Sequence, residues 1–195
     1  MMKNILLLCL TILPMLSFSQ DKKTMKRLEA QVKLAKEQEA AARKKQEKEN
    51  EKNLPATKIG ATFLPFHMVD ANHQFITDQD LPKDKPILLV LFNPMCDHCQ
   101  KVAKAISDNK PRFSDISILF VCGMNLLEEI PNFIAQSSIV DFPNFKVCAS
   151  NEEYTAQIFE SKGIPQIMMY NKDRLLQHIM YETIDIDLAL SHLSK

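Results

Sequence analysis

The sequence predicts an α/β protein built on one central mixed β-sheet with helices on both faces. Residues 87–92 and 116–123 are continuous apolar runs, which are typical of strands buried on both sides. A helical pattern separates them, and a strand, a helix and a strand with short connections form a right-handed crossover that makes the strands parallel. Two later apolar runs, residues 166–170 and 175–181, flank a short turn and predict an antiparallel hairpin that closes the sheet.

The length and charge of the chain limit its class. It has 195 residues, enough for one ordinary domain with a sizeable core and additional sequence at one end. It has 24 basic and 24 acidic residues and therefore no net charge, so we expect no nucleic acid as a partner. Partner choice must then depend on a local site.

Residues 1–19 have the pattern of a secretory signal peptide. Lys3 supplies the positive start, residues 5–16 the apolar core, and residues 17–19 a small-x-small cleavage pattern. The core contains Pro14 and is shorter than the ~20 residues that cross a bilayer, so we expect a cleaved signal and not an anchor. The mature protein is expected to be periplasmic or secreted.

Residues 20–56 are predicted to form a charged arm ahead of the domain. Between residues 21 and 53 the chain is rich in Lys, Arg, Glu, Gln and Ala and has no Gly or Pro to end a helix. An apolar seam fades beyond Ala35, which favours a solvated helix or a partly disordered spacer over a dimerising coiled coil. The folded domain is expected to span residues 57–195.

The domain is expected to start with an N-terminal hairpin extension. Residues 66–70 and 75–77 are short strand-like segments around a polar turn. The buried strand 87–92 follows a polar loop and is expected at the centre of the sheet. Beyond it, an amphipathic helix is predicted over residues 97–109, because apolar side chains recur there at spacings of three and four: Cys99, Val102, Ala103 and Ile106.

The second half of the domain continues the α/β pattern. After strand 116–123, residues 130–137 predict a helix, and residues 144–149 a short strand. A third helix is predicted over residues 152–161, with Tyr154, Ile158 and Phe159 on one side. The closing hairpin is followed by a last helix, residues 184–193, with Ile186, Leu190 and Leu193 on one stripe.

Cys96 and Cys99 stand where the strand 87–92 gives way to the helix. First-turn amides and the helix dipole stabilise negative charge, so Cys96 is expected to hold a thiolate near neutral pH and to be the nucleophile. Cys99, one turn further and more buried, would displace the mixed disulfide as the resolving thiol. His98 lies between them and would favour the Cys96 thiolate if it were protonated or donated a hydrogen bond.

Other uses of these residues stay open. A CxxC motif can supply half of a zinc site, although no second CxxC and no close pair of histidines follows. A static CxxC disulfide would be strained and reducible. His98 could simply be solvated. Cys122 and Cys148 are expected to be small buried side chains in strands, and they could pair if those strands are neighbours.

The apolar strand, the CxxC at a helix start, the crossover strand and residues 163–165 before a hairpin strand together resemble the thioredoxin fold. The N-terminal hairpin and the inserted helix-strand unit between Cys99 and Pro165 resemble the extracytoplasmic thiol-disulfide oxidoreductases of the TlpA and ResA type. The resemblance covers residues 57–192. It implies that Pro165 is a cis-proline and that Ile164 lies beside Cys96, pairing with a bound substrate chain.

The sequence also departs from that family. Met95 replaces the Trp that usually precedes the first cysteine, and it would give a softer platform for substrate. Val90 stands where thioredoxins keep a buried Asp that aids proton transfer from the second thiol. Gln100 and Lys101 follow Cys99 in place of an acidic residue, so the sequence shows no evident base for the resolving thiol.

We therefore expect a thiol-disulfide oxidoreductase that exchanges disulfides with exported cysteine-containing proteins and with a membrane or periplasmic redox partner. No bound cofactor or metal is expected, because electrons travel through the redox-active disulfide Cys96–Cys99. Two other classes remain open: a client-binding module with little turnover that uses the groove around Pro165, and a copper carrier that uses both cysteines and a histidine. The direction of electron flow and the oligomeric state stay open.

Overall fold

A computed structural model describes residues 33–34, 36–38, 55–139 and 143–194. The predicted signal peptide and most of the predicted arm lie outside these residues, and the described arm residues are helical and exposed. The chain divides into two compact units, Met1–Glu47 and Lys48–Lys195. No helix within the described residues is long and apolar enough to cross a membrane.

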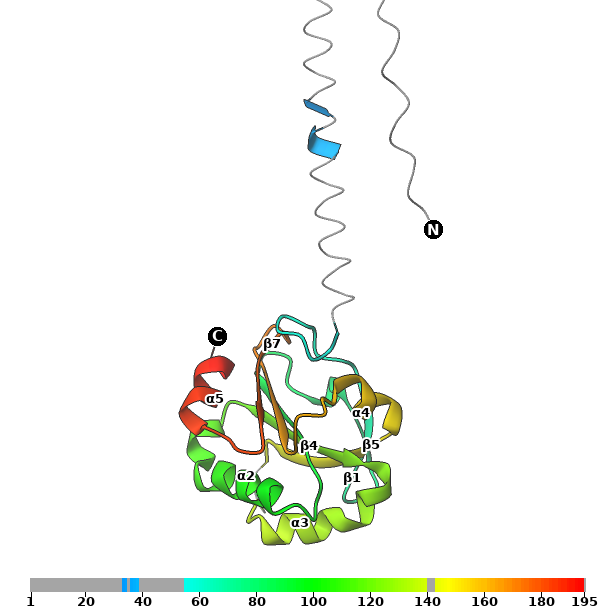
Figure 1. The fold of residues 1–195 in the computed structure, drawn as a ribbon, viewed down its shortest axis with the longest axis vertical. Helices are drawn as coiled ribbons and strands as arrows, with labels where there is room; N and C mark the ends of the chain where they lie inside the picture. Colours follow the sequence, from blue (N-terminus) through cyan, green and yellow to red (C-terminus); the bar gives the residue numbers. More distant parts are fainter. Residues whose placement is uncertain (1–32, 35, 39–54, 140–142, 195) are drawn as a thin grey trace, which may run out of the picture. The chain divides into compact units, whose positions relative to one another are not determined.

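A seven-stranded mixed sheet forms the centre of the described domain (Figure 1). Its strands lie in the order β2-β1-β5-β4-β3-β6-β7. β3, β4 and β5 are parallel, and the remaining pairs are antiparallel. The strand bounds are β1 His67–Asp70, β2 Phe75–Thr77, β3 Ile87–Leu91, β4 Ser117–Gly123, β5 Phe145–Ser150, β6 Gln166–Tyr170 and β7 Leu176–Tyr181.

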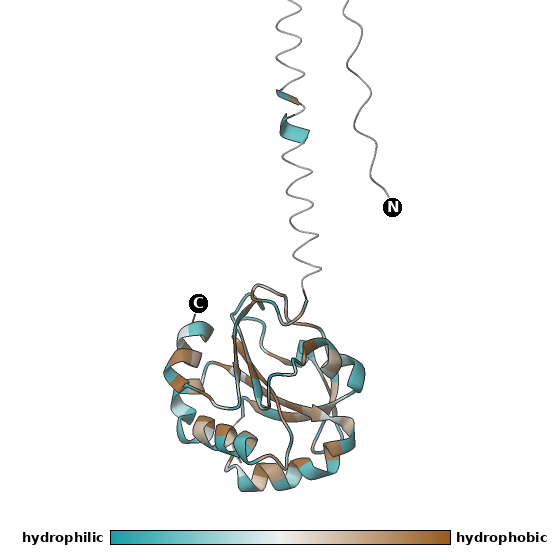
Figure 2. Cartoon of the chain, in the orientation of Figure 1, coloured by the Kyte–Doolittle hydropathy of each residue, from teal (hydrophilic) through white to brown (hydrophobic). Residues whose placement is uncertain are grey.

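Helices cover both faces of this sheet. α2, α3 and α5 contribute buried side chains to one apolar cluster, and α4 contributes to a second cluster with the segment that precedes β1. Figure 2 shows hydrophobic residues concentrated along the strands, whereas the helices carry both hydrophobic and hydrophilic residues. The helix bounds are α2 Asp97–Asp108, α3 Ile130–Gln136, α4 Glu152–Ile158 and α5 Ile186–Leu193. The predicted α/β class with a mixed sheet and helices on both faces is confirmed.

β3 shows why its sequence is continuously apolar. Leu88 and Val90 belong to the cluster under α2, whereas Leu89 and Leu91 belong to the cluster on the opposite face. A strand with both faces covered has no position left for a polar side chain. β3 is interior but not central, because β4 occupies the middle of the strand order.

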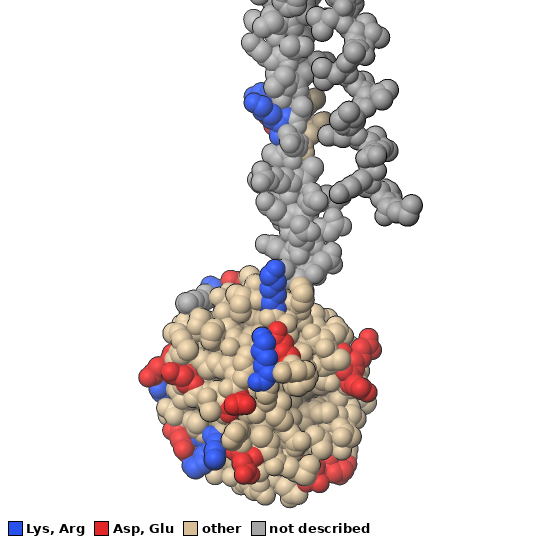
Figure 3. All heavy atoms as spheres, in the orientation of Figure 1, with Lys and Arg blue, Asp and Glu red and all other residues tan. Residues whose placement is uncertain are grey.

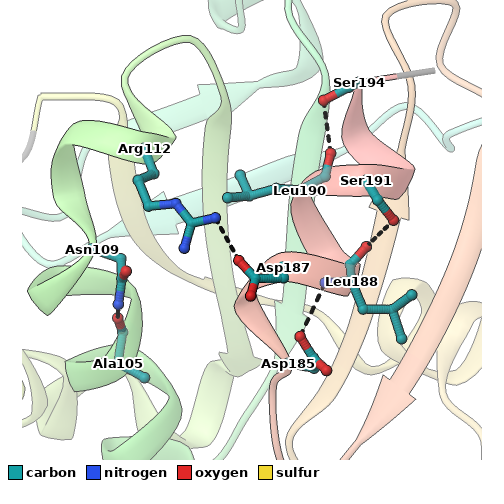
Figure 4. A network of polar contacts seen from close by, with 9 residues as sticks. All are labelled: Ala105, Asn109, Arg112, Asp185, Asp187, Leu188, Leu190, Ser191 and Ser194. Carbon is teal, nitrogen blue, oxygen red and sulfur yellow. Dashed lines mark hydrogen bonds and ion pairs between the residues drawn. The ribbon is translucent and has the colours of Figure 1, made fainter.

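Two helix boundaries differ from the prediction. α4 ends at Ile158 because Phe159 already has extended backbone angles, φ −82° and ψ 135°. The Phe159 side chain is 45% exposed, so the prediction that it shares the buried side of α4 with Tyr154 is wrong. α5 begins at Ile186 because Asp185 is its N-cap, and the Asp185 carboxylate accepts the Leu188 N–H at 3.0 Å (Figure 4).

Acidic and basic side chains are interspersed on the face of the domain that is in view in Figure 3. That face therefore has no large patch of a single charge. Exposed ion pairs such as Arg112–Asp187, whose nitrogen and oxygen are 2.6 Å apart, contribute little each to stability.

Candidate active site

The turn between β3 and α2 is fixed by Asn93. The Asn93 carbonyl oxygen accepts the Cys96 N–H at 3.0 Å, and its side-chain oxygen accepts the Met95 N–H at 2.9 Å. Upstream, the Phe92 N–H still pairs with the Val121 carbonyl of β4, at 3.0 Å. The chain therefore leaves the sheet edge in one tight turn that delivers Cys96 to the start of α2.

Cys96 is the N-cap residue of α2. Its backbone is extended, its side chain is half-buried, and its carbonyl accepts the Gln100 N–H at 3.1 Å. α2 has 12 residues, and the N-terminus of such a helix is the end that stabilises negative charge. Cys96 thus has both the access and the position that a reactive thiolate needs.

Cys99 has the opposite environment. It is fully buried on the inner face of α2 together with Val102, Ala103 and Ile106, as the helical spacing predicts. Burial is the main cause that raises the pKa of the Cys99 thiol to about 12. A hydrogen bond from the Asn93 backbone lowers this pKa by a smaller amount, and the neighbouring Cys96 raises it. Cys96 and Cys99 lie 3.1 Å apart, and both are free thiols.

Among the residues that the structure describes, no evident base lies beside Cys99. Val90 is fully buried in the same apolar cluster as Cys99, so the position that carries Asp in thioredoxins is filled by an apolar side chain. The groups that shift the Cys99 pKa are its burial, backbone groups and Cys96, and none of them is a carboxylate or an amine.

Gln100 ties the cysteine turn to its neighbours. Its side-chain amide donates to the Pro94 carbonyl at 3.3 Å and to the Gln136 side chain of α3 at 2.7 Å. In the sequence, Gln100 stands out only as a departure from the pattern of the family that the chain resembles. A polar bridge between two helices has no periodic signature, which is why the sequence does not reveal it.

The segment that precedes β6 reaches the same edge of the sheet as the cysteine turn. Gln166 pairs with Leu91, the last residue of β3, so Pro165 lies just beyond the end of that strand. The Ile164–Pro165 peptide bond is cis. Ile164 and Cys96 are both partly buried and pack against the same apolar cluster. The fold thus places Ile164 and Pro165 at the same end of β3 as the predicted dithiol.

Two other predicted site residues are on the surface. Met95 is 64% exposed immediately before Cys96, and its contact with a substrate stays a prediction. His98 is exposed in the first turn of α2, and its influence on Cys96 stays a prediction.

Cys122 and Cys148 lie on opposite faces of the sheet. Cys148 of β5 pairs with Val121 of β4, and Cys122, the next residue of β4, points to the opposite face of the sheet. The two cysteine side chains accordingly belong to different apolar clusters. The alternative that they form a disulfide is wrong, and the prediction that they are small buried side chains is confirmed.

Among the described residues, no group of three or more His, Cys, Asp or Glu side chains is placed to hold a metal ion.

Comparison with known proteins shows similarity in structure and not in sequence. No protein-family model and no curated protein matches the sequence. Among solved structures, a thiol:disulfide interchange protein of the thioredoxin family from Chlorobium tepidum matches with a TM-score of 0.58 and 12% identity, covering 70% of this chain and 97% of that one.

Two further structures agree. The thioredoxin domain of a thiol-disulfide oxidoreductase from Bacteroides vulgatus has a TM-score of 0.54 and 14% identity, covering 69% of this chain and 94% of that one. A secreted disulfide oxidoreductase from Mycobacterium tuberculosis also has a TM-score of 0.54 and 14% identity, covering 66% and 94%. The described domain has the thioredoxin-like fold.

Proposed function

We propose that this protein is a thiol-disulfide oxidoreductase in which Cys96 is the nucleophile and Cys99 the resolving thiol. The observation that carries the proposal is the contrast between the two thiols. Cys96 is half-buried at the start of α2, whereas Cys99 is fully buried one turn along the same helix, 3.1 Å away. The Cys96 thiol can reach a substrate, whereas the Cys99 thiol can reach only Cys96.

The exchange proceeds in two steps when the protein acts as a reductant. The Cys96 thiolate attacks a substrate disulfide, forms a bond to one substrate sulfur and releases the other as a thiolate. Cys99 then loses its proton and attacks the Cys96 sulfur, forming the Cys96–Cys99 disulfide and releasing the second substrate thiolate. Two electrons pass to the substrate, whose two sulfurs each take up a proton. The reverse sequence oxidises a substrate dithiol.

The substrate is proposed to bind between Met95 and the segment that contains Ile164 and Pro165. Ile164 packs against the same apolar cluster as Cys96, and its main chain is proposed to pair with an extended substrate segment. His98 is proposed to tune Cys96 from the surface of α2. The chemistry needs no bound cofactor, since the electrons are held in sulfur bonds.

The proposed partners are exported proteins with cysteines and a membrane or periplasmic redox protein. The signal-like residues 1–19 support export, and one of the structural neighbours is a secreted disulfide oxidoreductase. The N-terminal hairpin β1–β2, which extends the sheet beyond β5, supports the TlpA and ResA type within the thioredoxin-like proteins.

Reduction of insulin disulfides by the full chain, with dithiothreitol as the electron source, tests this function. The wild type and a Cys122→Ala control should accelerate the reduction, because Cys122 is buried and does not contact substrate. Cys96→Ser should be inactive. Cys99→Ser should accumulate a mixed disulfide with insulin.

A wild type that binds insulin without accelerating its reduction would contradict the proposal and support a client-binding module. The observation that favours this second candidate is the raised pKa of Cys99 without an adjacent base, since a slow resolving step would prolong the bound state.

A further inference from the structure

The connection between α4 and β6, residues 159–165, carries the proposed substrate-binding residues outside any helix or strand. Such a segment must be held in shape by other contacts if it is to receive a substrate chain. Gln166, the first residue of β6, is fully buried although its side chain is polar. A buried amide is costly unless its hydrogen bonds are formed, so its partners indicate what it does.

The Gln166 side chain spans the end of α4. Its amide nitrogen donates to the Ile158 carbonyl at 2.6 Å, and its amide oxygen accepts the Glu160 N–H at 2.7 Å. The first bond supplies a donor to the carbonyl of Ile158, the last residue of α4, and the two bonds together fix the direction in which residues 159–160 leave the helix. An apolar side chain of the same size could make neither bond.

Glu160 then anchors the segment to β7. Its carboxylate accepts hydrogen bonds from the Tyr181 hydroxyl and from Lys162, the latter at 3.0 Å. The Tyr181 bond is the main cause that lowers the Glu160 pKa, with Lys162 second. The Lys162 ammonium also lies 5.4 Å from the centre of the Tyr181 ring. The first half of the segment is therefore bonded to both neighbouring strands.

The second half of the segment is fixed by the end of β7. The Pro165 carbonyl accepts the Glu182 N–H at 2.8 Å. Gly163 has φ +117°, a backbone conformation that residues with a Cβ rarely adopt, so glycine is favoured there. All of these hydrogen bonds have partners in residues 159–165 or in the strands next to them, and none of them involves Cys96 or Cys99.

We propose that Gln166 and Tyr181 are positioning residues that hold residues 159–165 in the shape that receives the main chain of a protein substrate. This proposal rests on the proposed function. It predicts that loosening the segment impairs recognition of protein disulfides and leaves the dithiol chemistry intact, because the anchors and the cysteines share no bond.

The experiment compares full-chain Gln166→Met and Tyr181→Phe with the wild type on two substrates, insulin and the small aromatic disulfide dithiobis(nitrobenzoate), called dithionitrobenzoate below. For insulin, KM should rise roughly five- to tenfold in each variant, the loss expected from one to two hydrogen bonds. The kcat for insulin, the rate with dithionitrobenzoate and the reduction potential of the dithiol should stay within about twofold of the wild type.

Gln157→Met is the matched control, because Gln157 is an exposed residue of α4 that bonds only within its own helix, to Glu153 at 3.2 Å. It should behave as the wild type. Tyr181→Phe removes a single partly exposed hydroxyl and carries the test if Gln166→Met does not fold. An unchanged insulin KM in the folded variants, or an equal loss on both substrates, would overturn the proposal. A wild type that reduces neither disulfide would instead overturn the proposed function.

Discussion

Two thiols of one short motif acquire different chemistry from their places on a single helix. Cys96 caps α2 and is open to a partner, whereas Cys99 is enclosed by the apolar side of the helix. An enclosed thiol resists ionisation, and burial raises the pKa of Cys99 to about 12. In the proposed exchange, the first step thus depends on Cys96, and the second depends on removing a proton from Cys99.

The rate of the second step should therefore depend strongly on pH. The reactive form of Cys99 is its thiolate, whose fraction rises about tenfold per pH unit while pH is below the pKa. We expect release of a preformed mixed disulfide between Cys96 and a peptide to accelerate by nearly tenfold per pH unit, and so by about a hundredfold between about pH 7 and 9. Stopped-flow measurement of peptide release gives the rate, and a rate that is independent of pH would show that a base acts on Cys99.

The two cysteines and their unequal burial could be predicted from the sequence, because the CxxC spacing and the helical repeat are both local patterns. The supporting amides Gln100 and Gln166 could not. Each acts through contacts with segments that are distant in the chain or irregular in structure, and such contacts leave no periodic signal.

At the scale of elements, the predicted strands and α-helices are present in the structure, and their bounds differ mainly at two helix ends, whereas β4 and not β3 lies at the centre of the sheet. The apolar pattern continues past the true end of α4, so periodicity alone places Phe159 inside the helix, whereas the Gln166 bonds turn the chain outward there. At α5 the decisive residue is the capping Asp185, and it sets the first helical position at Ile186.

The Asp185 cap should contribute measurably to stability. Asp185→Ala removes the acceptor of the Leu188 N–H, and we expect the free energy of unfolding to fall by about 1 kcal/mol. Asp187→Ala, on the same turn, removes the exposed pair with Arg112 and an exposed carboxylate from the first turn of α5, and it should cost less, about 0.5 kcal/mol (Figure 4). Urea unfolding of both variants measures the difference. Equal losses would show that the cap is not the stronger contact.

For the whole molecule, buried thiols link stability to alkaline pH. Burial raises the pKa values of Cys99, Cys122 and Cys148 from the ordinary 9.0 to about 12. Below pH 9 these thiols are protonated in the folded and the unfolded chain, so their contribution is fully present. Between about pH 9 and 12 only the unfolded chain loses these protons, and the folded state is destabilised as pH rises.

We expect the free energy of unfolding of the reduced protein to fall with pH above 9, by up to about 1.4 kcal/mol per pH unit for each buried thiol. Cys122→Ala should make the slope shallower by about one such contribution. Denaturant unfolding at several pH values under reducing conditions gives both slopes, and identical slopes would show that Cys122 ionises equally in the two states.

The fold as a whole could be predicted from the order of buried strands and helices, because those patterns constrain the sheet topology. The side-by-side placement of the cysteine turn and residues 163–165 follows from the antiparallel pairing of β3 with β6. Whether that edge performs disulfide exchange depends above all on the unequal reactivity of its two thiols.

Alkylation of the reduced full chain with iodoacetamide at pH 7, followed by mass spectrometry of the labelled peptides, tests that inequality directly. We predict that Cys96 is modified at least about a hundredfold faster than Cys99, because burial both raises the pKa of Cys99 and shields it from the reagent. Equal rates, or faster modification of Cys99, would contradict the assignment of Cys96 as the nucleophile.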